Sequence, residues 1–167
     1  MKTRKFKVLF VCLGNICRSP LAEGIFRKKI REQGLEHALE TDSCGTGDYH
    51  IGKLPDHRTR SNAQANGVEL DHRCRQITPG DLEDFDLVLA MDNRNHQHIL
   101  SLSGAEKSAH KVCLMRQYDP RPTHPEVPDP YYGQERDFQE VCEILERSVD
   151  GLISDLRTEL AVSRNQD

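Results

Sequence analysis

The sequence predicts an α/β fold, a single-domain three-layer sandwich in which a four-stranded parallel sheet carries helices on both faces. Three observations lead to this prediction. Short apolar segments alternate along the chain with segments whose apolar residues recur at helical spacing. Strands that alternate with helices form parallel sheets covered on both faces. The length of 167 residues suits one hydrophobic core, and no linker or internal repeat divides it, so residues 1–167 are expected to form one domain.

The strands are expected at residues 6–11, 41–43, 85–91 and 112–115. Ser19 and Pro20 mark the start of a first helix that ends near Gly34, with the Ser19 hydroxyl as its cap. Further helices are expected over residues 58–66, directly after a capping Asp92, and over residues 138–160, where apolar residues form a strong stripe. The proline-rich stretch 118–133 is expected to be a long ordered loop, and such loops are often functional.

The composition is that of a soluble globular protein, and a cytoplasmic location is expected by default. A net charge of −4 without a strong basic cluster gives little support for nucleic-acid binding. Residues 2–13 are basic and then apolar, but the apolar part is too short for a signal peptide and lacks a cleavage site. No stretch reads as a membrane span. The six cysteines are expected to be free thiols. No metal is expected, because His96 and His98 point in different directions on their helix.

Residues 12–18 (CLGNICR) join the first strand to the first helix, at the edge of the sheet where ligands of parallel sheets bind. The positive end of the helix dipole and free backbone N–H groups favour an anion there. Gly14 permits unusual backbone angles and Asn15 tolerates them, while Arg18 offers a planar fork of donors to phosphate oxygens. Cys12 in that electropositive setting is expected to be a thiolate nucleophile, to which the Ser19 hydroxyl can donate.

Residues 11–20 (VCLGNICRSP) resemble the active-site motif of the low-molecular-weight protein tyrosine phosphatases. The likeness extends over nearly the whole chain, and a second specific motif is found at residues 128–132 (PDPYY). Supporting matches are residues 42–43 (DS), 49–52 (YHIG), 71–72 (DH), 75–78 (RQIT) and 91–92 (MD).

The resemblance implies hydrolysis of phosphotyrosine in two steps, without a cofactor or a metal. Cys12 attacks phosphorus and forms a phosphocysteine intermediate, and Arg18 stabilises the phosphate oxygens. Asp129 protonates the leaving tyrosyl oxygen and then acts as base toward water; read from the residues alone, an Asp between prolines is more often a turn residue. The loop residues expected to bind phosphate are Leu13, Gly14, Asn15, Ile16, Cys17 and Arg18.

The family resemblance also assigns side chains around the loop. Tyr49, Tyr131 and Tyr132 match positions that line the substrate cleft, where aromatic walls favour phosphotyrosine over the shorter phosphoserine. For Tyr132 an ordinary loop position is an equal alternative. Ser43 and His72, together with Asn15 and Ser19, match positions that support the loop by hydrogen bonds.

The cysteines are interpreted separately. The resemblance implies that Cys17 can trap oxidised Cys12 as a reversible disulfide, and a small residue packed under the loop is the alternative. Cys113 and Cys142 are expected in the core, and Cys44 and Cys74 have no assigned role.

Two other functions stay open at this point. Arsenate reductases have a similar loop but need further cysteines downstream, where this chain has only Cys74, and the phosphatase pair Asp129 and Pro130 is retained. A non-catalytic phosphotyrosine-binding module would tolerate loss of the nucleophile or the acid. The expected partners are phosphotyrosine-containing proteins, with inorganic phosphate or other oxyanions as inhibitors; a monomer that binds neither nucleic acid nor membrane is expected.

Overall fold

The computed structural model describes residues 4–165, which fold around a parallel sheet of four strands. The sheet order is β2-β1-β3-β4, and each neighbouring pair is parallel. The strands are β1 (Phe6–Cys12), β2 (Leu39–Gly45), β3 (Leu87–Ala90) and β4 (Val112–Leu114). The predicted sheet is confirmed, with β2 longer than expected.

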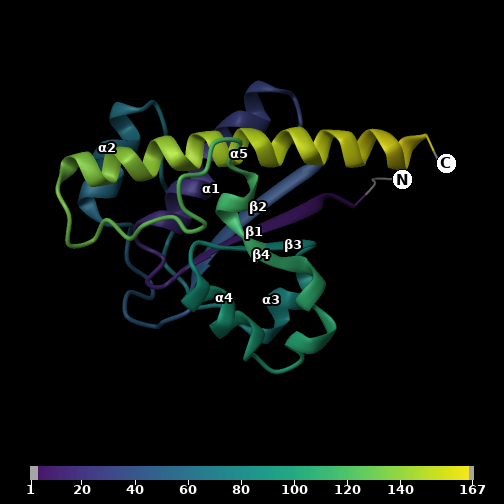
Figure 1. Cartoon of the computed structure of the whole chain (residues 1–167), viewed down its shortest axis with the longest axis horizontal. Coiled ribbons are helices and arrows are strands. Elements are labelled where there is room, and N and C mark those ends of the chain that lie inside the picture. The colour runs from purple at the N-terminus through teal and green to yellow at the C-terminus, as the bar shows by residue number, and fades with distance from the viewer. Residues whose placement is uncertain (1–3, 166–167) are drawn as a thin grey trace.

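Helices cover both faces of this sheet (Figure 1). One face carries α1 (Arg18–Glu32), α2 (His57–Ala65) and the long α5 (Glu135–Arg164), and the other carries α3 (Pro79–Asp84) and α4 (Asn93–Leu100). Three short 3-10 helices flank β4, namely η1 (Ala105–Lys107), η2 (Ala109–Lys111) and η3 (Met115–Tyr118). The three-layer arrangement is confirmed. No helix in residues 4–165 is both long and apolar enough to cross a membrane.

The central strand β1 explains why the first apolar run is continuous. Val8 and Phe10 pack into the core formed with α1 and α5, while Leu9 and Val11 pack into the core formed with α3 and α4. All four side chains have no exposed surface, and burial of each large apolar side chain contributes roughly 1.5–3 kcal/mol. A strand buried on both faces in this way has no alternation of polar and apolar residues.

The sheet order also fixes where a ligand can bind. From β1 the chain crosses to β2 on one side. Strand β3 lies on the opposite side of β1, and from β3 the chain continues away from β1 to β4. The connections after β1 and β3 therefore diverge and leave a crevice at the carboxyl ends of the two strands. Cys12 is the last residue of β1 and lies at this crevice.

Two local predictions need correction. Ser19 does not cap α1: the helix begins at Arg18, the N-cap position is Cys17, and no side chain caps it there. The Ser19 hydroxyl is instead buried and bonded within the loop that precedes the helix. Helix α3 was not expected, although Thr78 and Asp81 form a capping box around Pro79, which is a sequence signal for a helix start.

Candidate active site

The loop between β1 and α1 turns its carbonyl oxygens outward. The Cys12 and Leu13 oxygens accept from the N–H groups of residues 46 and 47, at 2.8 and 2.9 Å. The Ile16 oxygen accepts from the Asp56 N–H at 2.8 Å, and the Asn15 oxygen accepts from the Cys74 thiol at 2.8 Å. With these four carbonyl oxygens bonded from outside the loop, the N–H groups of the loop can face an anion.

Asn15 holds the turn of this loop in a conformation that few residues adopt. Its φ is 57°, in the left-handed region, and its side chain is fully buried. The amide nitrogen donates to the hydroxyls of Ser19 (2.8 Å) and Ser43 (3.0 Å). The amide oxygen accepts from the Arg75 N–H (3.0 Å) and bonds His72 Nε2 (2.7 Å). All the bonding capacity of the Asn15 amide is used to fix the loop.

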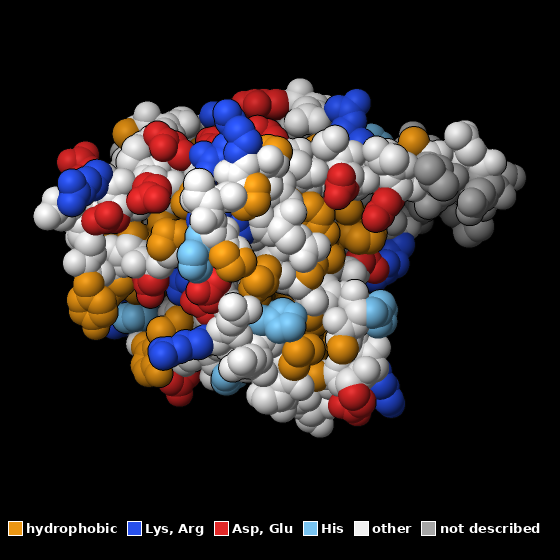
Figure 2. Space-filling view, viewed as in Figure 1, with side chains coloured by type: hydrophobic (Ala, Val, Ile, Leu, Met, Phe, Trp, Pro, Cys, Tyr) orange, Lys and Arg blue, Asp and Glu red, His pale blue; other side chains and the backbone are white. Residues whose placement is uncertain are grey.

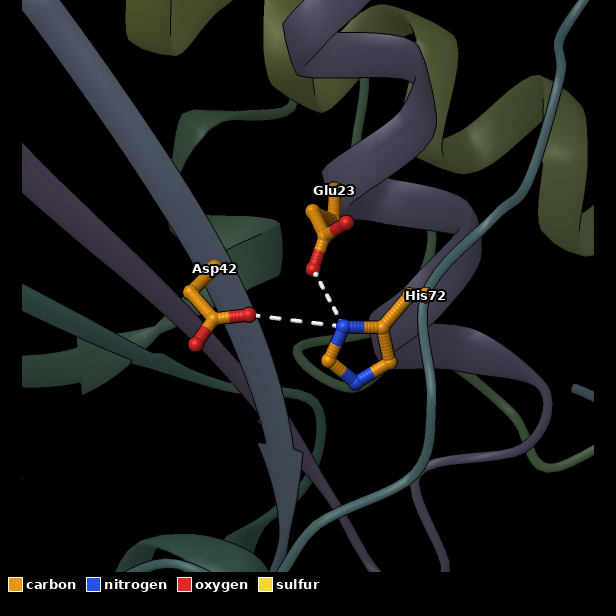
Figure 3. A group of neighbouring side chains, drawn as sticks. All are labelled: Glu23, Asp42 and His72. Atoms are coloured by element: carbon orange, nitrogen blue, oxygen red, sulfur yellow. Dashed lines mark ion pairs between the residues drawn. The ribbon is translucent and has the colours of Figure 1, made fainter. Parts of the chain in front are cut away.

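His72 continues this network to two carboxylates, Glu23 on α1 and Asp42 on β2 (Figure 3). Its Nδ1 lies 3.1 Å from Glu23 Oε1 and 3.4 Å from Asp42 Oδ1. Burial alone would lower the pKa of His72, but hydrogen bonds to Asp42 and Glu23 and their charges raise it to about 9. For the carboxyl group of Asp42, burial has the opposite effect and would raise the pKa. Hydrogen bonds from His72 and from the Ser43 N–H outweigh burial and lower the pKa of Asp42.

These three groups are also close enough together to be considered as metal ligands. A protonated imidazole donates from both ring nitrogens and has no lone pair for a metal. His72 is placed to donate to the Asn15 oxygen from one nitrogen and to carboxylates from the other. With both ring nitrogens of His72 facing hydrogen-bond acceptors, this arrangement favours hydrogen bonding over metal coordination.

Arg18 and Asp129 face each other across the mouth of the loop. The Arg18 side chain is 3% exposed, and its Nη1 donates to Asp92 Oδ2 (2.7 Å) and to the Val127 oxygen (3.1 Å). Its Nη2 lies 3.6 Å from Asp129 Oδ2. Burial would lower the pKa of Arg18, but the charges of Cys12, Asp92 and Asp129 raise it, so the guanidinium stays charged. Asp129 is more exposed and accepts from the Tyr131 N–H at 3.1 Å.

These groups line one cavity of about 330 Å³. Of the predicted residues, its wall contains Cys12, Leu13, Gly14, Ile16, Cys17, Arg18, Tyr49, Asp129, Tyr131 and Tyr132. Tyr49 and Tyr131 are partly exposed at its rim, and Tyr132 is 97% exposed. Figure 2 shows hydrophobic side chains interspersed with charged ones at this end of the molecule, over the loops that follow the strands. The other predicted residues, Asn15, Ser19, Ser43 and His72, lie behind the cavity wall.

The nucleophile candidate lies at the bottom of this cavity. Cys12 is 3% exposed, and its sulfur lies 3.0 Å from the Ser19 hydroxyl oxygen. The Ser19 oxygen accepts from Asn15, and its single proton can be donated to the Cys12 sulfur at 3.0 Å or to the Cys44 oxygen at 3.3 Å. The predicted free thiols are confirmed for all six cysteines in this structure. Burial raises the pKa of Cys17 to about 12, although a hydrogen bond to Thr59 opposes this.

A sequence model of the family described as "Low molecular weight phosphotyrosine protein phosphatase" matches residues 7–162. The chain belongs to this family. The predicted enzyme class, a protein-tyrosine phosphatase and hence a hydrolase, is confirmed at the family level.

Individual relatives agree with this assignment to the phosphatase family. A low molecular weight protein-tyrosine-phosphatase of Streptomyces coelicolor is 41% identical over 93% of this chain and 96% of its own length. The crystal structure of a protein tyrosine phosphatase from Entamoeba histolytica is 38% identical, with a TM-score of 0.89 over 93% of this chain and 99% of that chain. A structure described as a Drosophila arginine phosphatase is 29% identical, with a TM-score of 0.83 over 90% of this chain and 98% of that chain.

Sequence reasoning missed several residues of this phosphatase site. His50 lines the cavity next to Tyr49, and its ring lies 3.2 Å from where a Cβ on Gly14 would stand. Asp92 was expected only as a helix cap, a role it has, yet its other oxygen holds Arg18. Glu23 gave no signal, because a Glu inside a charged helix is usually exposed. His50 and Asp92 lie inside the quoted family matches at residues 49–52 and 91–92 and could have been singled out there, but nothing local would have found Glu23.

Proposed function

We propose that this phosphatase acts on phosphotyrosine by the two-step mechanism expected for its residues. The Cys12 sulfur attacks phosphorus as the bond from phosphorus to the tyrosyl oxygen breaks. The electron pair goes to that oxygen, which takes the proton held by Asp129. Arg18 and the loop N–H groups hold the three other phosphate oxygens as their charge shifts. Asp129 then accepts a proton from water, whose oxygen attacks phosphorus and displaces the Cys12 thiolate.

The observation that carries this proposal is the meeting of Cys12, Arg18 and Asp129 in one cavity. The Ser19 hydroxyl, 3.0 Å from the Cys12 sulfur, stabilises the thiolate as attacking and as leaving group. The pairing of Arg18 with Asp92 fixes the guanidinium before substrate arrives, so that its orientation does not have to be created during the reaction.

An aryl phosphate suits this cavity better than phosphoarginine, the kind of substrate that the Drosophila relative's description suggests. The rim presents Tyr49, Tyr131 and the apolar Leu13. Such side chains pack against an aromatic ring. Among the described lining residues the only carboxylate is Asp129, which the reaction itself uses, so a substrate guanidinium would lack a second anionic partner.

Steady-state kinetics on two substitutions test the proposal. Cys12→Ser is expected to abolish turnover of p-nitrophenyl phosphate while inorganic phosphate still binds. Asp129→Ala is expected to lower kcat/KM by about 10²-fold for phenyl phosphate, and by much less for p-nitrophenyl phosphate, whose leaving group hardly needs a proton. Residual turnover by Cys12→Ser would contradict the nucleophile assignment. Faster wild-type hydrolysis of a phosphoarginine peptide than of the matched phosphotyrosine peptide would contradict the substrate assignment.

We further propose that residues 1–167 form one domain and that the protein is a cytoplasmic monomer inhibited by inorganic phosphate and other oxyanions. The family match over residues 7–162 supports the single domain. The anion-binding geometry of the loop supports the inhibition, which competition with p-nitrophenyl phosphate measures.

A further inference from the structure

A path of hydrogen bonds connects the two halves of the candidate site through α2. On one side, the Asp56 N–H donates to the Ile16 oxygen of the phosphate loop at 2.8 Å. On the other side, Arg58 Nη1 donates to the Tyr131 oxygen at 2.9 Å, and the Tyr131 N–H donates to Asp129 Oδ1 at 3.1 Å. The phosphate loop and the acid loop are thus joined through two residues, Asp56, which bonds the phosphate loop with its backbone N–H, and Arg58.

The Arg58 guanidinium contacts one carboxylate, one carbonyl oxygen and two aromatic rings. It pairs with Asp56 through two bonds, Nε to Oδ1 at 3.1 Å and Nη2 to Oδ2 at 2.9 Å. The Arg58 bond lowers the pKa of Asp56, which also accepts from the Arg58 N–H as the cap of α2. The guanidinium carbon lies 5.3 Å from the Tyr131 ring centre and 4.7 Å from that of Phe138, within the range of cation–π contact.

We propose that Arg58 is a positioning residue that sets Asp129 in place for proton transfer, an inference that rests on the proposed function. Its side chain is 44% exposed, and exposed ion pairs contribute little to stability. Its fixed guanidinium instead clamps the backbone two residues after Asp129, whose own side chain is 45% exposed. Displacement of a catalytic group by about 1 Å can reduce a rate by roughly 10²-fold, so this clamp acts on the proton-transfer step.

The test compares kcat/KM for a substrate that needs the acid, phenyl phosphate, with one that hardly does, p-nitrophenyl phosphate. Arg58→Met keeps the apolar stem and removes the donors. It is expected to lose about 10-fold on phenyl phosphate and less than about 3-fold on p-nitrophenyl phosphate. The inhibition constant of inorganic phosphate is expected to stay within about 2-fold, because the loop that binds the anion is left intact.

Arg136→Met is the matched control. Arg136 is an exposed residue that lines the same groove between α2 and α5 as Arg58. This control is expected to change kcat/KM by less than about 2-fold for both substrates. Arg58→Lys keeps the charge without the planar fork. It is expected to show the same selective loss at about 3-fold, and it decides the test if Arg58→Met does not fold.

A double substitution separates positioning from a general structural effect. In the Asp129→Ala background, Arg58→Met is expected to add no further selectivity between the two substrates, because the positioned group is already gone. Equal losses on both substrates in Arg58→Met, or in Arg58→Lys where that variant decides, would overturn the inference alone. So would an undiminished selective loss in the Asp129→Ala background. Lack of selectivity in Asp129→Ala itself would overturn the proposed function, and this inference with it.

Discussion

His72 gives a prediction about stability whose size follows from its surroundings. The imidazole is 9% exposed and lies between Glu23, which is 2% exposed, and Asp42. Because the folded protein raises the pKa of His72 from 6.5 to about 9, the protonated ring stabilises the fold. This contribution is fully present below pH 6.5 and is lost as the pH rises through 9.

The magnitude follows from the same pKa values. One pKa unit is equivalent to about 1.4 kcal/mol, so protonated His72 contributes on the order of 3 kcal/mol to the free energy of unfolding. For a chain of this size, 1 kcal/mol changes Tm by about 2–4 °C. His72→Gln is therefore expected to lower Tm by roughly 10 °C at pH 6.5. Near pH 10 the wild-type ring is neutral and no longer forms ion pairs with Glu23 and Asp42, so the two proteins should converge.

Urea unfolding at a series of pH values from 6 to 10, at constant ionic strength, measures this difference. His110→Gln is the matched control, because His110 is exposed and lies outside the cluster; its difference from the wild type should stay within about 0.5 kcal/mol throughout. A difference between wild type and His72→Gln that stays constant from pH 6.5 to 10 would refute the assignment of a charged His72. In that case the cost of the substitution would come from packing alone.

Two further predictions concern the loop. After peroxide treatment, dithiothreitol should restore wild-type activity by reducing a Cys12–Cys17 disulfide. Cys17→Ser should recover less than half as much activity, because unprotected Cys12 is oxidised irreversibly. Equal recovery of Cys17→Ser and a Cys142→Ser control would argue against the disulfide. Gly45→Ala should lower kcat/KM at least about 10-fold, because a Cβ there would lie 2.7 Å from the Leu13 oxygen and 3.0 Å from the Asn15 nitrogen. Gly80→Ala, whose Cβ would meet only Thr78 Oγ1 at 3.6 Å, is its control, and similar activity in both would contradict the close approach.

The predictions that succeeded depend on local patterns. Strand β1 shows as a continuous apolar run because both of its faces are buried. Asp92 was expected to cap the helix that follows, and its side chain does accept from the Asn95 N–H. Strand β2 was expected only at residues 41–43, because its sequence LETDSCG is largely polar. Its full length, Leu39–Gly45, comes from pairing with β1 along the whole strand, which no local pattern encodes.

The parts of the site that escaped prediction share a physical reason. Glu23, Asp56 and Arg58 are charged residues in or beside helices, where solvent exposure is the usual outcome. Their significance comes from partners that the fold brings together: Glu23 meets a histidine 49 residues later, and Arg58 meets a carbonyl 73 residues later. A charged side chain in a sequence does not reveal whether its partner is water or a distant backbone group.

The same consideration explains why Asp129 required the family resemblance. Its carboxylate reaches the site because the Val127 N–H bonds the Met91 oxygen at the end of β3 and because Arg18 holds the Val127 oxygen. The acid loop is therefore attached to the sheet on one side of Asp129 and, through Arg58, to α2 on the other. Two attachments on opposite sides restrict the carboxylate more than either would alone, since the backbone between them has only a few residues in which to rotate. An acid on an exposed loop can in this way be held with the accuracy that proton transfer requires.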